Sequence, residues 1–173
     1  MSRRWFFLFF LVSGFCSLVY QVVWLRLAMA SFGVTTPVVS IVLSVFMAGL
    51  ALGSWGAGRL VQRHENWSAA ALVRLYALAE LVIGISGLAV PHELRLGRQL
   101  LDAAGGDATW ASWSHYLASG TWIAVVLLPY CTAMGATLPL AMAALRRSAS
   151  AGSAQSFSYL YLANVLGLSL IHI

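Results

Sequence analysis

The chain has 173 residues, of which 61% are hydrophobic and 9% are charged, and its formal net charge is +5. Soluble domains carry about 25% charged residues, so this composition excludes an ordinary soluble protein and places the chain in the membrane class. The ten basic residues are all arginines. Because they gather at the ends of apolar segments, the positive charge indicates membrane topology and not a nucleic-acid partner.

Four long apolar segments follow one another and predict membrane-spanning helices. A spanning helix needs about 20 mostly apolar residues at about 1.5 Å rise each, and every segment meets this length. The segments are residues 5–25, 38–58, 69–90 and 118–144. A fifth apolar segment covers 157–173 and has no helix stop signal at its end. We therefore predict an all-α polytopic bundle over residues 1–173, with four complete spans, a partial fifth and more protein to follow.

The first segment carries a line of polar side chains. Ser13, Ser17, Gln21 and Trp24 recur every three or four residues, with Tyr20 beside them, so they share one face of a helix. This face predicts either the lining of a polar cavity or hydrogen bonds to a neighbouring helix. The apolar run is longer than the 7–15-residue core of a signal peptide, which favours a first spanning helix.

Small residues and prolines mark the second and fourth segments. Gly49, Gly53 and Gly56 give the second segment a face on which another helix can approach closely. Pro129 and Pro139 lie inside the fourth segment, where each removes a backbone N–H and bends the helix. Bent helices occur at transporter binding sites, but the proline pattern alone is weak support for such a site.

Glu80 lies near the middle of the third segment and is its most informative residue. A carboxylate at the centre of a bilayer costs about 2.5–3.5 kcal/mol on insertion scales, so its presence indicates that it faces protein or a wet cavity. Gly84 and Gly87 lie on the same helical face as Glu80, and Tyr76 lies beside that face. These small residues predict that another helix approaches this face closely.

Two interpretations of Glu80 stay open. In the first, the carboxylate belongs to an intramembrane polar site for a proton, a cation or a polyamine-like amine. The other members of that site are Tyr20, Gln21 and Arg26 of the first segment. In the second interpretation, Glu80 makes a purely structural hydrogen bond to Gln21 or Arg26.

The arginines also predict the orientation of the chain. With a cytoplasmic N-terminus, seven arginines fall on the cytoplasmic side and three fall on the other side, which is the usual positive-inside bias. Residues 91–117 then form an outside loop. Within it, residues 92–104 carry leucines at helical spacing and predict a short amphipathic helix on the membrane surface.

No residue pattern predicts a catalytic, cofactor-binding or metal site. Cys16 and Cys131 both lie in apolar segments, and the four histidines are scattered. The sequence has no Gly-x-Gly-x-x-Gly or P-loop motif, and no cluster of histidine, cysteine and carboxylate with metal-ligand spacing. We therefore expect no cofactor and no metal, with the lipid bilayer as the surroundings of the chain.

Several sequence blocks resemble membrane-bound spermidine synthase-like proteins, in which a major-facilitator-like membrane part is fused to a spermidine synthase domain. The blocks occur in order and cover nearly the whole chain. They are residues 13–15 (SGF), 17–27 (SLVYQVVWLRL), 46–54 (FMAGLALGS), 58–60 (GRL), 76–78 (YAL) with Glu80, 134–140 (MGATLPL), and Tyr161 with Ala163, Asn164 and Gly167.

The resemblance implies a transmembrane module that anchors or serves a cytosolic aminopropyltransferase-like domain, in a bacterial inner membrane. That domain would have a Rossmann-like fold and bind decarboxylated S-adenosylmethionine and putrescine. Its glycine-rich loop and catalytic aspartate match nothing in this sequence, so the resemblance assigns no catalytic residue here. It implies instead that the synthase-like domain is a partner in a C-terminal part that this chain lacks.

An alternative is the N-terminal part of a major-facilitator-type secondary transporter for a polyamine or another cation. Residues 53–63 are similar to the cytoplasmic loop of that superfamily but lack its usual aspartate. A scaffold without a substrate is a third interpretation. The oligomeric state stays open, because faces of small residues suit internal packing and dimerisation equally.

Overall fold

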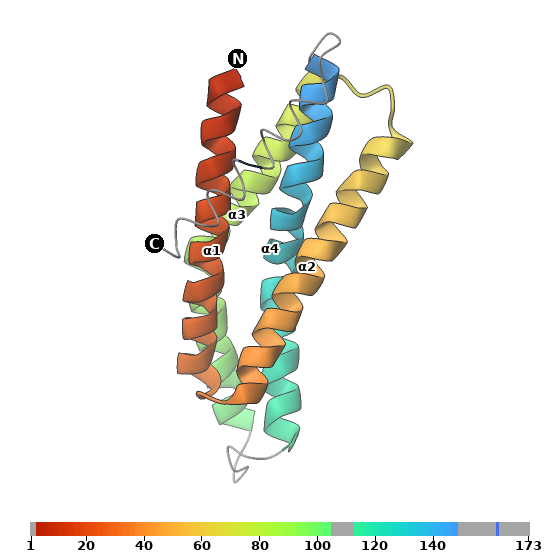
Figure 1. Cartoon of the computed structure of the whole chain (residues 1–173). Coiled ribbons are helices and arrows are strands. Elements are labelled where there is room, and N and C mark those ends of the chain that lie inside the picture. The colour runs from red at the N-terminus through yellow and green to blue at the C-terminus, as the bar shows by residue number, and fades with distance from the viewer. Residues whose placement is uncertain (1–2, 105–112, 149–161, 163–173) are drawn as a thin grey trace.

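The computed structural model describes residues 3–104, 113–148 and 162, and these residues include four helices and no strand. The helices run up and down the long axis of the molecule (Figure 1). They are α1 (Arg3–Phe32), α2 (Thr36–Arg63), α3 (Ala69–Ala104) and α4 (Trp113–Ser148). Each is long and apolar enough to cross a membrane, so the predictions of an all-α fold and of four helices of spanning length are confirmed. The predicted fifth span at 157–173 lies outside the described residues, apart from Leu162.

A short turn joins α1 to α2. Gly33 has a φ of 99°, in the left-handed region that favours glycine, and its N–H donates to the carbonyl of Met29 at 3.0 Å. Thr35 is the N-cap residue of α2, and Pro37 occupies the first turn, where its missing N–H removes no helical hydrogen bond. These residues end α1 and reverse the chain, so α2 runs antiparallel to α1 (Figure 1).

α3 continues through Pro91 and reaches Ala104 as one helix of 36 residues. The prediction of a separate surface helix at 92–104, within a loop from 91 to 117, is therefore wrong. This segment extends α3, and α4 already begins at Trp113.

Packing against α4 explains why the helix does not end at Pro91. Val90 and Leu94 are fully buried in the main core, one on each side of the proline. One turn further on, a Cβ built on Gly97 would lie 2.1 Å from the indole nitrogen of Trp122, so the two helices are in close contact there. Proline removes one helical hydrogen bond, but burial of the same apolar face before and after it holds α3 in a single helix.

α4 is the central helix of the bundle. It packs along both α2 and α3, whereas α1 lies against the others over a smaller area (Figure 1). The main core contains side chains from all four helices, among them Trp24 of α1, Val42 of α2, Leu94 of α3 and Leu127 of α4, each at most 1% exposed. Between lipid-embedded helices, this close packing is itself the source of association, because lipid tails are as apolar as the side chains.

The outward faces of the helices are apolar as well. Large hydrophobic side chains stay exposed along every helix, a surface that would promote aggregation in water and that lipid tails would cover. Examples are Val12 and Val19 on α1, Met47 and Leu52 on α2, Leu81 and Leu88 on α3, and Val125 on α4. This distribution suggests a lipid environment around the bundle.

The tightest contact between helices joins α2 to α4. A Cβ built on Gly53 would lie 2.0 Å from the carbonyl oxygen of Thr132, and a Cβ on Gly49 would also collide with α4. From the other side, a Cβ on Gly135 would lie 2.2 Å from the carbonyl oxygen of Leu50. The backbones therefore approach so closely that only glycine fits at these positions.

An arginine side chain connects three helices at one end of the bundle by hydrogen bonds. The Arg147 guanidinium, in the last turn of α4, donates hydrogen bonds to the carbonyl oxygens of Trp67 and of His64, the latter at 3.2 Å. Both carbonyls belong to the connection between α2 and α3, in which the His64 and Trp67 rings stack with centroids 4.4 Å apart. One side chain thus ties the end of α4 to the turn between two other helices.

Candidate intramembrane polar site

Glu80 points from α3 toward α1. Its Oε1 accepts a hydrogen bond from the Ser13 hydroxyl at 2.9 Å, and the Tyr76 phenol, one turn earlier on α3, interacts with both side chains. Glu80 lies about 17 Å along α3 from its first residue, which is about three turns into the helix. The carboxylate is therefore held by hydroxyl groups inside an apolar helix.

Among the residues that the structure describes, no arginine forms an ion pair with Glu80. In the part of the chain that the structure describes, the one ion pair joins Arg98 to Asp102 at 3.6 Å, far along α3 from Glu80. A carboxylate inside an apolar helix is stable when it is protonated or when a cation pairs with it. Within the described residues Glu80 has hydrogen-bond donors but no positively charged partner, which leaves the neutralising role open to a ligand.

α1 and α3 run parallel with a constant register. Ser13 contacts Glu80, and seven residues further along each helix the Tyr20 hydroxyl would lie 2.9 Å from a Cβ built on Gly87. Both pairs are separated by 67 residues in sequence. The two helices therefore keep the same register over two turns. The Ser13–Glu80 hydrogen bond and the close Tyr20–Gly87 contact belong to one interface between α1 and α3.

This register separates the residues that the sequence grouped into one site. Gln21 lies about 12 Å and Arg26 about 20 Å along α1 from Ser13, so neither is at the level of Glu80. Arg26 is exposed, and the Tyr20 ring packs on Trp24 with centroids 5.3 Å apart. The expected partners Tyr20, Gln21 and Arg26 are thus replaced by Ser13 and Tyr76.

A cavity of about 220 Å³ lies beside Ser13, between α1, α2 and α4. Its lining contains the hydroxyls of the serines at 13, 17 and 54 and of Thr137, and the backbone of Gly135. The full lining is Ser13, Ser17, Leu18, Phe46, Leu50, Ser54, Met134, Gly135, Thr137 and Leu138. Ser13 therefore borders the cavity and also holds Glu80.

The polar groups of this cavity are mainly acceptors. The Ser17 hydroxyl donates its proton to the Ser13 carbonyl at 2.9 Å, and Thr137 donates to the Met134 carbonyl at 2.7 Å. A hydroxyl has one proton but two lone pairs, so the oxygens keep acceptor capacity. Pro139 has no N–H for the carbonyl of Gly135, which loses its usual helical donor. The cavity is thus suited to a ligand that donates hydrogen bonds.

Glu93 is a second polar residue that the sequence interpretation missed, because it was assigned to the outside loop. Its Oε1 accepts a hydrogen bond from the Tyr130 hydroxyl at 3.1 Å, and its carbonyl accepts one from the Trp122 indole at 2.9 Å. Its Oε2 is buried and has no partner among the described residues. The signal was present in the sequence: Glu93 lies one helical turn from Val90 and precedes Leu94, on the face that continues through Pro91.

The five glycines predicted to pack helices behave differently. Gly49 and Gly53 meet α4, and Gly87 meets the Tyr20 ring. Among the described residues nothing lies within 4 Å of a Cβ built on Gly56 or Gly84, so these two positions pack no described helix. Their helix faces point away from the neighbouring helices of this chain.

The described residues contain no group of three or more histidine, cysteine, aspartate or glutamate side chains that could hold a metal ion. Comparison with known proteins adds no relative: no protein-family model, no curated protein and no solved structure matches this chain.

Proposed function

We propose that the chain is the membrane-embedded module of a spermidine synthase-like protein, and that this module holds a small cation, either a proton or a protonated amine, at Glu80. One observation carries the cation site: the Glu80 carboxylate is fixed between α1 and α3 by Ser13 and Tyr76 and has no cationic partner in the described chain. A positively charged ligand would neutralise the Glu80 carboxylate at a membrane depth where an unpaired carboxylate is unfavourable.

The neighbouring cavity supports an amine in particular. An ammonium group donates three hydrogen bonds and accepts none, which complements the hydroxyl and carbonyl oxygens around Ser13 and Thr137. Its carbon chain would lie against the apolar part of the lining, such as Phe46 and Leu138. A linear aliphatic diamine combines both properties.

The position of the family-like sequence blocks supports the same assignment. All ten residues that line the cavity belong to blocks that resemble spermidine synthase-like proteins, and Tyr76 and Glu80 belong to another such block. Blocks far apart in the sequence thus meet around one polar site.

Equilibrium binding of radiolabelled putrescine to the detergent-solubilised chain tests the proposal. We expect Glu80→Gln to weaken binding at least about tenfold, because an amide cannot neutralise an ammonium group, and one lost charge pair of about 1.4 kcal/mol gives this factor. Glu93→Gln is the matched control, because Glu93 is a partly buried carboxylate on the same helix that contacts Tyr130 of α4 and not Ser13. Equal binding by wild type and Glu80→Gln would exclude the site, and a folded wild type that binds no putrescine would exclude the amine.

A second candidate is the N-terminal part of a major-facilitator-type transporter for the same class of cation. The cavity between α1, α2 and α4 favours it, because a transported substrate needs space between helices and not only an anchor in the membrane. The reading frame downstream of codon 173 discriminates the two. A soluble domain with a glycine-rich nucleotide-binding loop would support the synthase-like module, whereas further spans without such a domain would support the transporter.

A further inference from the structure

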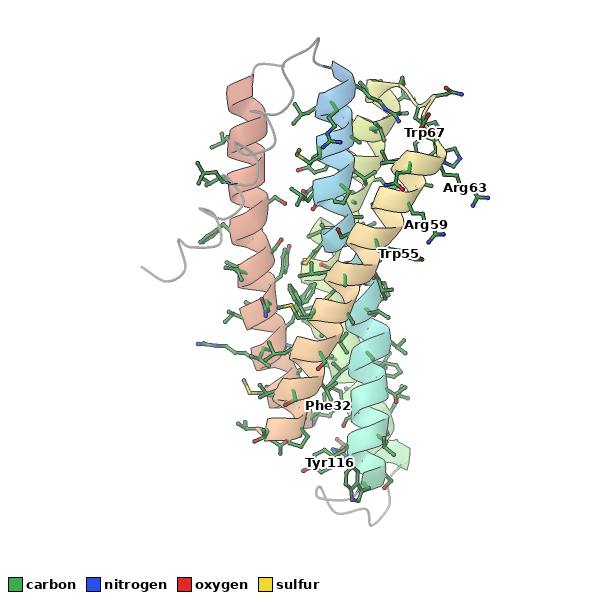
Figure 2. All side chains as sticks on the ribbon, turned by 45° about the vertical axis from the view of Figure 1, so that its right-hand side comes forward. Phe32, Trp55, Arg59, Arg63, Trp67 and Tyr116 are labelled. Atoms are coloured by element: carbon green, nitrogen blue, oxygen red, sulfur yellow. The ribbon has the colours of Figure 1, made fainter. Side chains whose placement is uncertain are left out.

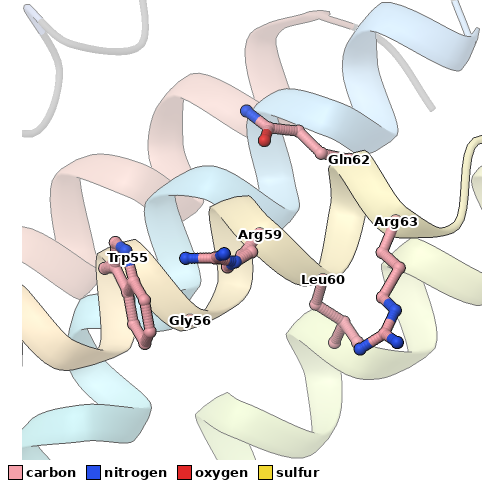
Figure 3. Close-up of a pocket in the computed structure, with 6 residues that line it drawn as sticks. All are labelled: Trp55, Gly56, Arg59, Leu60, Gln62 and Arg63. Atoms are coloured by element: carbon pink, nitrogen blue, oxygen red, sulfur yellow. The ribbon is translucent and has the colours of Figure 1, made fainter.

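We propose that the outward face of the last three turns of α2 binds the phosphate of an anionic lipid headgroup, through Arg59 and Arg63 above the Trp55 ring. These three side chains follow a spacing of four residues, so they form one ridge along the helix. Figure 3 shows Trp55, Arg59 and Arg63 along α2, with the Arg59 side chain directed toward Trp55.

This ridge lies on the side of α2 that faces away from the bundle. The side that packs on α4 contains Gly49, Gly53 and Ala57, which also recur every four residues and are buried. The ridge is offset from that line by two positions, or about 200° around the helix, so it points outward. In Figure 2 the labelled side chains of Trp55, Arg59 and Arg63 accordingly follow the outer edge of the molecule.

The surface of the ridge is hollowed and rich in donors. A depression of about 680 Å³ is lined by Trp55, Gly56, Arg59, Leu60, Gln62 and Arg63. The Arg59 guanidinium lies 5.2 Å from the centre of the Trp55 ring, a cation–π contact that holds it in place. Gly56 leaves open space beside the ring, because a Cβ built there would meet nothing within 4 Å. Each guanidinium group is therefore accessible to a phosphate from outside the bundle.

The charge on the ridge is not balanced within the described chain. Neither Arg59 nor Arg63 forms an ion pair with a carboxylate of the described residues, and the acidic residue next along the sequence, Glu65, lines a different groove toward α4. Two arginines four residues apart on one helix repel each other, and a phosphate bound at the ridge would reduce this repulsion. The planar guanidinium groups match the oxygens of a phosphate in bidentate geometry.

The depth of the ridge suits a lipid headgroup and not a soluble anion. α2 has 28 residues and a length of about 42 Å, which exceeds the hydrocarbon core of about 30 Å, so its last turns reach the headgroup layer. Tryptophan prefers this boundary, and arginine next to it is the usual partner of anionic headgroups. Trp55 is 63% exposed, which a lipid beside the helix would cover.

Native mass spectrometry of the full chain with phosphatidylglycerol tests the site, with phosphatidylcholine as the zwitterionic reference. We expect Arg59→Gln with Arg63→Gln to weaken phosphatidylglycerol binding about thirtyfold, which corresponds to about 1 kcal/mol for each arginine. The matched control is Arg95→Gln with Arg98→Gln, which removes the same charge from exposed positions on α3. We expect this control to stay within about twofold of wild type, since arginines away from the ridge would contribute little.

A further variant separates a built site from general charge attraction. Trp55→Ala keeps both charges and removes the ring beneath Arg59, and we expect about threefold weaker phosphatidylglycerol binding. Equal losses in the two double arginine variants, or unchanged binding when Arg59 and Arg63 are both replaced, would overturn the proposal. Because Trp55, Arg59 and Arg63 are all exposed, far-ultraviolet circular dichroism should show wild-type helix content in each variant.

Discussion

The α2–α4 contact and the α1–α3 contact hold helices together in different ways. Between α2 and α4, Gly53 and Gly135 bring backbone against backbone, so no side chain can adjust if the helices move. Between α1 and α3, the Ser13 hydroxyl meets the Glu80 carboxylate, and Tyr20 covers Gly87 with its ring. The α2–α4 contact is rigid because backbone atoms of the two helices touch directly. The α1–α3 contact instead depends on polar side chains, whose hydrogen bonds a ligand could replace.

This difference separates a closely packed part of the bundle from a less extensively packed part. α2, α3 and α4 form a frame in which α4 is central, and α1 lies against that frame over a smaller area (Figure 1). The polar groups of the candidate site lie where α1 meets the frame, so binding at Glu80 would act on the least extensively packed helix. The frame itself is expected to tolerate little change.

The largest effect is expected where the frame is tightest. Gly53→Ala would place a Cβ 2.0 Å from the carbonyl oxygen of Thr132, a backbone atom that cannot move without shifting α4. Overpacking of this kind costs about 1–3 kcal/mol, and we expect the upper end. The free energy of unfolding in mixed detergent and dodecyl sulfate micelles, followed by circular dichroism, measures it.

Gly56→Ala is the matched control on the same helix. Nothing lies within 4 Å of a Cβ at this position, so the variant should be as stable as wild type or more stable by up to about 1 kcal/mol. Equal destabilisation by the two variants would contradict the close α2–α4 contact.

Removal of the arginine at the end of α4 should have the next largest effect. Arg147→Ala eliminates two charge-assisted hydrogen bonds to the carbonyls of His64 and Trp67, and we expect about 2 kcal/mol lower stability. The adjacent Arg146 is exposed and makes no such bond within the described chain, so Arg146→Ala should change stability by less than about 0.5 kcal/mol. Similar losses at both positions would show that charge, and not the tie between helices, matters.

The Glu93 contact between α3 and α4 should contribute less. Tyr130→Phe removes the hydroxyl that donates to Glu93 Oε1 and is expected to lower the free energy of unfolding by about 1 kcal/mol. Glu93→Gln keeps an acceptor at this position and should cost less than Tyr130→Phe. The opposite order would show that the charge of Glu93, and not its hydrogen bond, stabilises the pair.

The smallest effect is expected at the polar contact between α1 and α3. Ser13→Ala removes the hydrogen bond to Glu80, and interhelical bonds of this kind average about 0.6 kcal/mol in membranes. Ser17→Ala is the control, because the Ser17 hydroxyl donates to a carbonyl of its own helix. A loss of several kcal/mol at Ser13 would mean that α1 is held by this contact and is part of the rigid frame.

Several features of the fold were predictable because they are local. Apolar length predicted four helices, and a glycine pattern predicted the close-packing positions Gly49 and Gly53. The continuation of α3 through Pro91 was missed because a proline usually ends an isolated helix, although the apolar face continues on both sides of it in the sequence. The same error placed Glu93 in a loop and concealed its contact with Tyr130.

The sequence by itself determined that four helices form, that their surfaces suit lipid, and that Glu80 cannot face lipid without a partner, since composition and helical periodicity act within each segment. The tertiary structure decided which partner Glu80 has. Ser13 instead of Gln21 or Arg26 lies opposite it because the register between α1 and α3 depends on contacts such as Tyr20 on Gly87, which join residues 67 positions apart. Helical periodicity defines the face of each helix but not the level at which two faces meet.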